Sequence, residues 1–456
     1  MTVASSKLLR WTLCLCSTWV ATAPSTSNAQ ATPTGSEAAL AASEPAAPPP
    51  AERTLAAAAP APAAQVEALG GWPVPRISGL VQVDAILMNQ TSVDEVDPGS
   101  GLPLNENRFV LRRARLTADV DRGYFRGYVS LEASSLGDPP LRVHGAEVAV
   151  GYPRGSDPLL LAAGGLFLVP FGFGLLEPDA ERLFLEPALW VNALFPGRRD
   201  LGVRAEGRFR FLHAVIAVLN GEPSVAAFPV HDPNAAKDVV ARLTVTAPLR
   251  PTLKIVAGAS VLLGTGFHRG RPQSKESLVW RDANEDGVAQ LSEIQALGGL
   301  PAEASRNFAR YGLMGDLMAS ARFQVLGDFR LLAEVVWAKN LDRGLWRADP
   351  VAAGRGVREL AYTFALQQQL TRHAELGVRY EYYNPDFDAN ERQAIALVPV
   401  DAKFTTLTLT AAWRTFEPGR LSVEYAHRTN PLGRSQSGTP TTLASDSFVV
   451  RAQLAF

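Results

Sequence analysis

Apolar and polar residues alternate along most of the chain after Arg76, which is the pattern of β-strands with one apolar face. The final segment, 446–456, shows this pattern clearly and ends on an aromatic residue. Its apolar residues occupy alternate positions: Phe448, Val450, Ala452, Leu454 and Phe456. Side chains alternate between the two faces of a strand, so the polar residues of the segment share the other face. Such a segment is typical of the last strand of an outer-membrane β-barrel, although a β-sandwich strand alternates in the same way.

The same alternation predicts about 16 strands. We expect them at 77–88, 107–120, 124–135, 141–152, 159–168, 201–210, 212–220, 237–247, 252–264, 308–323, 328–338, 357–370, 373–383, 403–414, 419–428 and 446–456. The connections after even-numbered strands are tight, as at 121–123 and 417–418. Those after odd-numbered strands are long, except at 137–140: 89–106, 169–200, 221–236, 265–307, 339–356, 384–402 and 429–445.

This alternation of short and long connections decides the fold class. Bacterial barrels have short periplasmic turns at one rim and long loops at the other, and an even strand count returns both termini to the periplasm. A soluble sandwich has no reason to keep that order. We therefore predict an all-β protein, a transmembrane antiparallel β-barrel of about 16 strands that occupies residues 76–456.

The first 29 residues are expected to be a secretory signal peptide. Lys7 and Arg10 precede the apolar segment 11–23, and residues 27–29 (Ser-Asn-Ala) offer a small-x-small cleavage site. That segment is too short to span a bilayer as a helix, which takes about 20 residues. Both cysteines lie in this peptide, so the mature chain should contain neither a thiol nor a disulfide.

Residues 30–75 are rich in Ala and Pro and are expected to form an extended periplasmic linker. The whole chain is 47% hydrophobic, which is ordinary for a soluble protein. A membrane barrel carries its hydrophobicity in alternation, so this average is compatible with one. The net charge of −1 argues against nucleic acid as a partner, because it provides no global basic field.

Charged residues gather on the strand faces opposite the apolar ones, which we assign to a barrel lumen. A barrel of 16 strands encloses an aqueous channel. The candidate pore-lining residues are Arg113, Arg115, Arg126, Arg204, Arg208, Arg210 and Arg379. If the sheets belonged to a soluble protein, the same charges would mark only their solvated face.

Two stretches of the chain resemble the phosphate-selective porin O/P family of Gram-negative outer membranes. One is Asn107–Leu116 with the following strand Tyr124–Glu132, and the other is Gly165–Gly172 with Phe195–Val203, Gly207 and Asn220-Gly221. The resemblance covers most of residues 76–456. It implies a sixteen-stranded porin in the outer membrane, usually a homotrimer in contact with outer-membrane lipid, that passes small anionic solutes. It also implies that the loop after strand 5 folds inward and narrows the pore.

Residues 169–200 correspond to this inward loop, and their own chemistry permits the path. Pro170, Gly172 and Gly174 interrupt the strand, and large aromatic residues can pack inside the barrel. The candidate constriction residues are Trp190, Phe195, Arg198 and Arg199.

The selectivity of such a channel has two interpretations. Arginine suits oxyanions because its planar fork pairs with two oxygens, which favours an anion-preferring porin for phosphate-like solutes. Lysine, however, is scarce after the signal peptide, and carboxylates share the expected lumen face: Glu132, Glu206, Glu334, Glu375 and Glu381. In the alternative, arginines and glutamates pair across neighbouring strands and only stiffen the wall.

Residues 282–293 fit the calcium-loop pattern D-x-[DN]-x-[DN]-G-x5-E. This spacing aims oxygen ligands at one centre. The candidate ligands are Asp282, Asn284, Asp286, Val288, Gln290 and Glu293. A strand-like segment, 277–281, replaces the usual entering helix, although 291–297 can form a short exiting helix. We expect a solitary, structural calcium site in an outer loop, with an acidic surface turn as the alternative.

No catalytic residues are expected. The six histidines are scattered, and no motif of a hydrolase or nucleotide-binding enzyme occurs. Ser422 and His427 fall on opposite faces of their strand, so they cannot form a Ser-His pair. Two alternatives to a porin remain, namely an outer-membrane hydrolase and a calcium-dependent surface or structural barrel with a plugged lumen.

Overall fold

The computed structural model describes the barrel and parts of its loops. The described residues are 74–89, 107–136, 140–153, 158–222, 233–281, 284, 287–288, 290–323, 327–393, 396–399, 403–416, 418–429, 433–434, 440–441 and 446–456. The predicted signal peptide (1–29) and the linker (30–75) up to residue 73 lie outside this set. So do Asp282 and Asp286 of the calcium motif.

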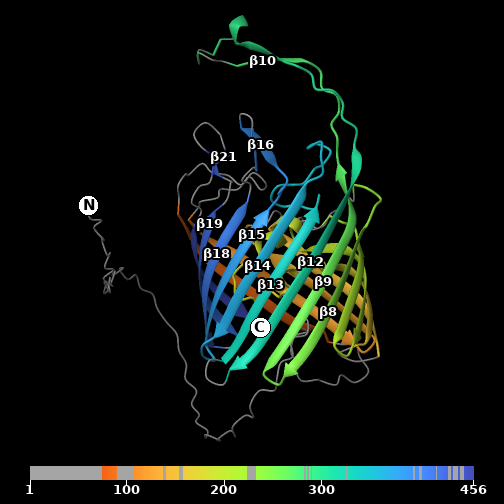
Figure 1. Ribbon diagram of the computed structural model, residues 1–456, viewed down its shortest axis with the longest axis vertical. Helices are drawn as coiled ribbons and strands as arrows, with labels where there is room; N and C mark the ends of the chain where they lie inside the picture. Colours follow the sequence, from red (N-terminus) through yellow and green to blue (C-terminus); the bar gives the residue numbers. More distant parts are fainter. Residues whose placement is uncertain are drawn as a thin grey trace, which may run out of the picture. The chain divides into compact units, whose positions relative to one another are not determined.

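Sixteen antiparallel strands form one closed barrel, in which each pairs with its neighbours in chain order (Figure 1). They are β1 (Arg76–Met88), β2 (Arg108–Arg122), β3 (Phe125–Ala133), β4 (Leu141–Tyr152), β5 (Leu160–Leu168), β6 (Arg199–Phe209), β7 (Leu212–Leu219), β8 (Asp238–Arg250), β9 (Leu253–His268), β12 (Arg306–Phe323), β13 (Gly327–Lys339), β14 (Arg358–Gln369), β15 (Ala374–Asn384), β18 (Phe404–Phe416), β19 (Gly419–Thr429) and β22 (Ser447–Ala455). The predicted transmembrane barrel, its strand number and its alternation of short and long connections are confirmed.

The last strand closes the barrel by pairing with the first. Leu80 of β1 lies opposite Ala455 of β22, and the register continues to Met88 opposite Ser447. Phe456 extends the ladder, since its N–H donates to the Gly79 carbonyl at 3.0 Å and its carbonyl accepts from the Gly79 N–H at 2.7 Å. The predicted faces are confirmed here: Phe448, Leu454 and Phe456 are exposed, whereas Arg451 and Gln453 are buried inside.

Three long loops carry short two-stranded sheets: β10–β11 (Ser277–Trp280 and Ile294–Leu297), β16–β17 (Asn390–Gln393 and Ala396–Pro399) and β20–β21 (Gly433–Arg434 and Pro440–Thr441). The exiting helix expected at 291–297 is wrong. Only Leu291–Glu293 forms a 3₁₀ turn (η1), because Ile294–Leu297 pairs with Ser277–Trp280 as a strand. No helix in the described part of the chain is long and apolar enough to cross a membrane.

The connection between β5 and β6 folds into the barrel, as predicted. It carries two short helices, α1 (Phe173–Leu176) and α2 (Leu189–Leu194). Its aromatic residues Phe171, Trp190 and Phe195 are at most 1% exposed and contact one another, with ring centroids 5.1 to 6.4 Å apart. They belong to one apolar cluster with inward-facing residues of several strands, among them Leu219, Val240, Leu262, Met314, Val336, Ala361 and Tyr383. We call residues 169–198 the inward loop.

Two candidate residues lie elsewhere than the sequence suggested. Arg199 was placed in the inward loop, but it is the first residue of β6 and lies opposite Leu168 of β5, so it belongs to the wall. Arg210 was placed on the lumen face, but it lies in the turn between β6 and β7, where its backbone has a positive φ of 52°.

Candidate functional site: the ion-paired inward loop

Glu186 of the inward loop is one of the carboxylates that tie the loop to the barrel wall. Its Oε1 accepts from Arg112 Nε at 2.8 Å and from Arg451 Nη2 at 2.7 Å, and its Oε2 accepts from Arg113 Nη2 at 3.1 Å. Arg112 and Arg113 belong to β2, and Arg451 belongs to the closing strand β22. The loop carboxylate thus connects three guanidinium groups on two strands that flank β1.

A β-bulge makes this arrangement possible. The register between β1 and β2 shifts after Gln82, which lies opposite Arg113, so that Val83 lies opposite Leu111 and Arg112 is the extra residue. A bulge re-aims side chains, and here it lets two consecutive arginines reach the same carboxylate. Strict alternation would have pointed Arg112 at lipid. The signal in the sequence was the Arg112-Arg113 pair itself, because a regular strand cannot keep both charges out of the membrane.

Asp179 is another anchoring carboxylate of the loop. It accepts from Arg198 Nη2 at 2.6 and 2.8 Å, from Arg115 Nη2 at 2.7 Å and from Arg182 Nη1 at 2.9 Å. Arg115 also pairs with Glu132 of β3, so one guanidinium joins the loop to two strands. The candidate residues Arg115 and Arg198 therefore meet at an aspartate that was not among the predicted site residues. An acidic residue in a loop expected to enter an arginine-lined lumen was the available signal.

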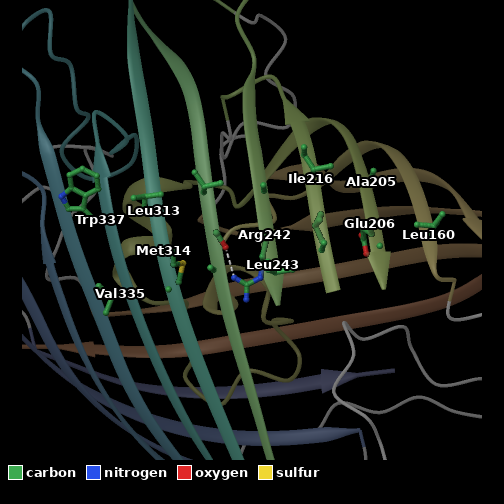
Figure 2. Close-up of a pocket in the computed structure, with 18 residues that line it drawn as sticks. Leu160, Ala205, Glu206, Ile216, Arg242, Leu243, Leu313, Met314, Val335 and Trp337 are labelled. Atoms are coloured by element: carbon green, nitrogen blue, oxygen red, sulfur yellow. Dashed lines mark hydrogen bonds between the residues drawn. The ribbon is translucent and has the colours of Figure 1, made fainter. Parts of the chain in front are cut away.

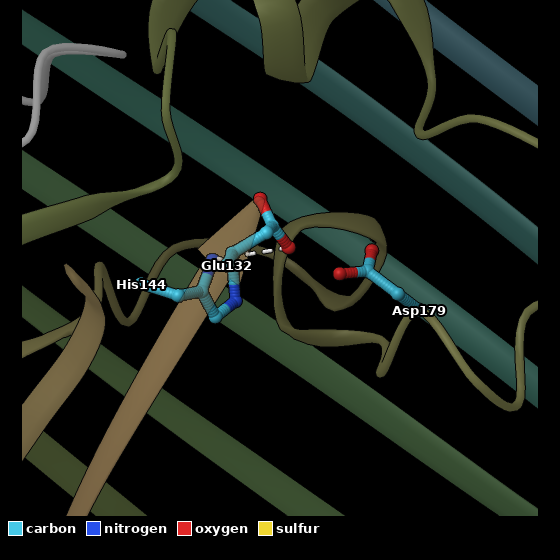
Figure 3. Close-up of side chains that lie close together, drawn as sticks. All are labelled: Glu132, His144 and Asp179. Atoms are coloured by element: carbon cyan, nitrogen blue, oxygen red, sulfur yellow. Dashed lines mark ion pairs between the residues drawn. The ribbon is translucent and has the colours of Figure 1, made fainter. Parts of the chain in front are cut away.

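Glu132, His144 and Asp179 lie close enough to suggest a metal site, and Figure 3 shows the two wall residues facing the loop aspartate. Their partners argue against a cation. Arg115 already bridges the two carboxylates, and Arg199 Nη2 lies 3.2 Å from His144 Nε2. The His144 Nδ1 faces Glu132 at 3.5 Å. Guanidinium groups thus already contact the carboxylate and imidazole atoms that a metal would need as ligands. The cluster is an ion-pair network.

The surroundings of both loop carboxylates favour their ionised forms. Burial alone would raise the pKa of Asp179, but the guanidinium groups, chiefly those of Arg198 and Arg113, hold it well below its usual range. Burial likewise opposes ionisation of Glu186, and Arg112 and Arg113 lower its pKa well below the ordinary value.

Three wall glutamates hold the loop by its backbone. Glu334 of β13 accepts from the N–H groups of Gly174 at 2.7 Å and Phe173 at 3.1 Å, and from the Trp190 indole at 3.3 Å. Glu381 of β15 accepts from the Leu189 N–H at 2.7 Å. Glu424 of β19 accepts from the Leu185 N–H at 2.9 Å. Glu334 and Glu381 therefore satisfy amides that the N-terminal ends of the two short helices leave unpaired, and Glu424 does the same for an amide between the helices.

Most of the predicted pore-lining arginines are paired with carboxylates. Arg204 lies 2.9 Å from both Glu147 and Glu206, and Arg379 lies 3.0 Å from Glu381. Arg126 lies 3.2 Å from Asp121, and Arg208 lies 3.9 Å from Glu206. The alternative in which lumen arginines brace the wall therefore describes these residues and also Arg113 and Arg115.

Two lumen arginines differ, because neutral groups bond them. Arg199 Nη1 donates to the Tyr128 hydroxyl at 3.2 Å, and its Nη2 faces the His144 ring. Arg420 Nη2 donates to the Arg182 carbonyl at 2.8 Å and to Gln453 Oε1 at 3.0 Å. Neither guanidinium lies within 4.0 Å of any carboxylate in the described part of the chain, and the Nε of each has no hydrogen-bond partner there.

The calcium candidates that the structure describes lie beside the β10–β11 hairpin. Glu293 is 7% exposed, and its Oε2 accepts from the Trp280 indole at 2.9 Å and from the Gln290 N–H at 3.4 Å. Asn284 and Val288 belong to the turn that connects the two strands. Calcium binding stays a prediction.

Ser422 and His427 lie on opposite faces of β19, as the sequence indicated. Ser422 is 1% exposed and faces inward, whereas His427 is exposed and pairs with Asp446 at 2.9 Å. They cannot act together as nucleophile and base.

The fold is similar to those of solved outer-membrane proteins. The outer-membrane channel DcaP of Acinetobacter baumannii has a TM-score of 0.51 and 13% identity, over 84% of this chain and 97% of that chain. OprB of Pseudomonas putida has a TM-score of 0.53 and 11% identity, over 84% and 94%. An anion-selective porin from Comamonas acidovorans has a TM-score of 0.47 and 13% identity, over 84% and 99%. No protein-family model and no curated protein matches the chain. At these identities the similarity concerns the fold alone.

The ion-pair network predicts a pH dependence of stability. Both loop carboxylates have pKa values below those of an unfolded chain, about 3.9 for Asp and 4.3 for Glu. The stability that they contribute is therefore complete above about pH 5 and declines as the pH falls through the folded-state pKa. Asp179→Asn should lower the free energy of unfolding at pH 7 by about 3 to 5 kcal/mol, since it leaves buried guanidinium groups unpaired.

The measurement is thermal unfolding of wild type and Asp179→Asn at a series of pH values. The difference in free energy of unfolding between the two proteins should stay constant from pH 7 to 5 and shrink below about pH 4. Glu375→Gln is the matched control, because Glu375 pairs with the exposed Arg414 at the rim. If the difference in stability stayed constant down to pH 2, the ionised and ion-paired state of Asp179 would be contradicted.

Proposed function

We propose that this protein is an outer-membrane porin, a water-filled channel for the passive diffusion of small anionic solutes. The observation that carries the proposal is the pair of lumen arginines, Arg199 and Arg420, whose guanidinium groups are bonded only by neutral partners. A cation without a counter-ion inside a barrel attracts anions. By its resemblance to the phosphate-selective porin O/P family, the protein would favour phosphate-like oxyanions.

Location and assembly follow from the same proposal. The barrel would lie in the outer membrane of a Gram-negative bacterium, after cleavage of the signal peptide, with residues 30–75 in the periplasm. The family resemblance implies a homotrimer. The DcaP structure, with a similar fold, is described as an outer-membrane channel, which supports a channel role here.

A plugged, non-conducting barrel is the second candidate, and one observation favours it. The inward loop bonds to wall residues around the barrel, from Arg113 on β2 to Ser260 on β9, Glu334 on β13 and Arg451 on β22. A loop with so many contacts narrows the lumen, and conductance decides whether an opening remains.

The first prediction concerns the pore. The purified barrel should give discrete conductance steps in planar bilayers, and replacing residues 173–194 with a short Gly-Ser linker should enlarge them. A wild-type barrel with no steps would establish the plugged alternative. Because the deletion exposes an apolar cluster, Glu334→Gln serves as a second variant: it weakens one loop anchor and should raise the frequency of conductance fluctuations. Unchanged records for both folded variants would remove the constriction from the proposal.

The second prediction concerns selectivity. Replacing Arg199 and Arg420 with Gln should lower the anion-to-cation permeability ratio by about fivefold, since a unit charge at about 4 Å contributes about 1 kcal/mol in water. Reversal potentials in asymmetric KCl measure the ratio. Arg204→Gln combined with Glu147→Gln is the control, because it removes an ion pair of net charge zero. If the wild type, the variant at Arg199 and Arg420, and the control had equal anion-to-cation permeability ratios, the two arginines would not select anions.

We also propose that the outer loop binds calcium as a structural ion. Calcium should protect residues 265–307 from limited proteolysis, because Asp282, Asp286 and Glu293 would otherwise crowd like charges together. Glu293→Gln should abolish that protection and leave the barrel intact. Glu276→Gln, in the same loop but outside the motif, is the control. Identical cleavage of the wild-type loop with calcium and with chelator would show that the loop has no structural calcium site.

A further inference from the structure

A shallow apolar groove of about 910 Å³ crosses the lipid-facing wall of the barrel from β5 to β13 (Figure 2). Its floor consists of small residues: Ala205, Gly207, Ala214, Ala241, Ala259 and Gly315. Larger side chains stand beside it: Leu160, Ile216, Leu243, Leu313, Val335 and Trp337. The charged neighbours Glu206 and Arg242 belong to the opposite, lumen side of the same strands, where Arg242 bonds Ser260 at 2.9 Å.

The register of the strands explains the groove. Gly207 lies opposite Ala214, and Ala259 lies opposite Gly315. Directly opposed residues share one face of a sheet, so missing side chains on neighbouring strands produce one depression. A Cβ added to Gly315 would meet no atom within 4 Å. The lipid-facing surface is therefore recessed at this point because its residues are Gly and Ala, and a larger side chain would fit at Gly315.

The β13 end of the groove carries an aromatic pair and a lysine. The rings of Tyr311 and Trp337 are 5.3 Å apart, and Lys339 Nζ lies 5.9 Å from the Tyr311 ring centroid. Lys339 is the last residue of β13, at the rim that carries the long loops. It forms no ion pair with any carboxylate that the structure describes. Aromatic residues and snorkelling lysines of this kind mark the membrane–water interface.

We propose that the groove binds an anionic, phosphate-bearing lipid of the outer leaflet, with an acyl chain along its floor and the phosphate on Lys339. Charge complementarity favours a lipid over a second copy of this chain. No lipid-facing strand position in the described barrel carries Asp or Glu, so the wall of a second copy would offer Lys339 no counter-ion. A phosphate oxygen would supply it, and Trp337 and Tyr311 would flank the headgroup.

The test is native mass spectrometry of the intact barrel in detergent, titrated with phosphatidylglycerol or with phosphatidylcholine of the same acyl chains. Wild type should retain phosphatidylglycerol about fivefold more tightly, the effect of one lysine at an anionic headgroup. Lys339→Met should remove this preference and keep residual binding of both lipids. Gly315→Leu fills the groove and should reduce binding of both. Ala452→Leu, an exposed residue on β22 outside the groove, should behave as wild type.

Each outcome bears on the proposal. Equal retention of the two lipids by wild type, or wild-type retention by folded Gly315→Leu, would overturn it. A change of oligomeric state in Gly315→Leu without a change in lipid retention would assign the groove to a contact between copies and overturn it as well. Retention of folding by each variant is checked by its heat-dependent mobility on gels.

Discussion

Lipid on one side of the wall forces the charged side chains of the strands to the other side, except at the rims, and the interior must then satisfy those charges. A charge in hydrocarbon is costly, and a buried charge is stable only when it is paired and hydrogen-bonded. The inward loop supplies the partners. Two of its carboxylates, Asp179 and Glu186, pair with guanidinium groups from several strands, and its backbone amides donate to wall glutamates. The loop and the polar wall therefore stabilise each other.

The loop has two unlike sides. Phe171, Trp190 and Phe195 pack on apolar inward residues from β7 to β15, whereas Asp179 and Glu186 face the arginines of β2 and β22. Apolar packing is not directional, but charge-assisted hydrogen bonds to several guanidinium groups are. The first interaction keeps the loop in the barrel, and the second sets where it lies.

The sequence predicted the barrel well, because alternation and connection length are local patterns that lipid and turn geometry impose directly. It predicted the inward loop through Pro170 and Gly172 and through a family resemblance. It did not predict which charges meet. Arg112 was missed because a bulge breaks alternation, and Arg199 was assigned to the loop because strand ends are poorly marked. Which arginines keep only neutral partners depends on contacts between distant segments, such as Arg420 with Arg182, and no local pattern encodes them.

The position of Arg451 has a consequence for assembly. Glu186 receives one of its three guanidinium partners from β22, the strand that closes the barrel against β1. Until that strand arrives, the loop carboxylate is incompletely neutralised and the lumen edge is open. Docking of the loop and closure of the sheet are therefore one cooperative event, in which β22 completes a charge cluster whose other arginines lie on β2.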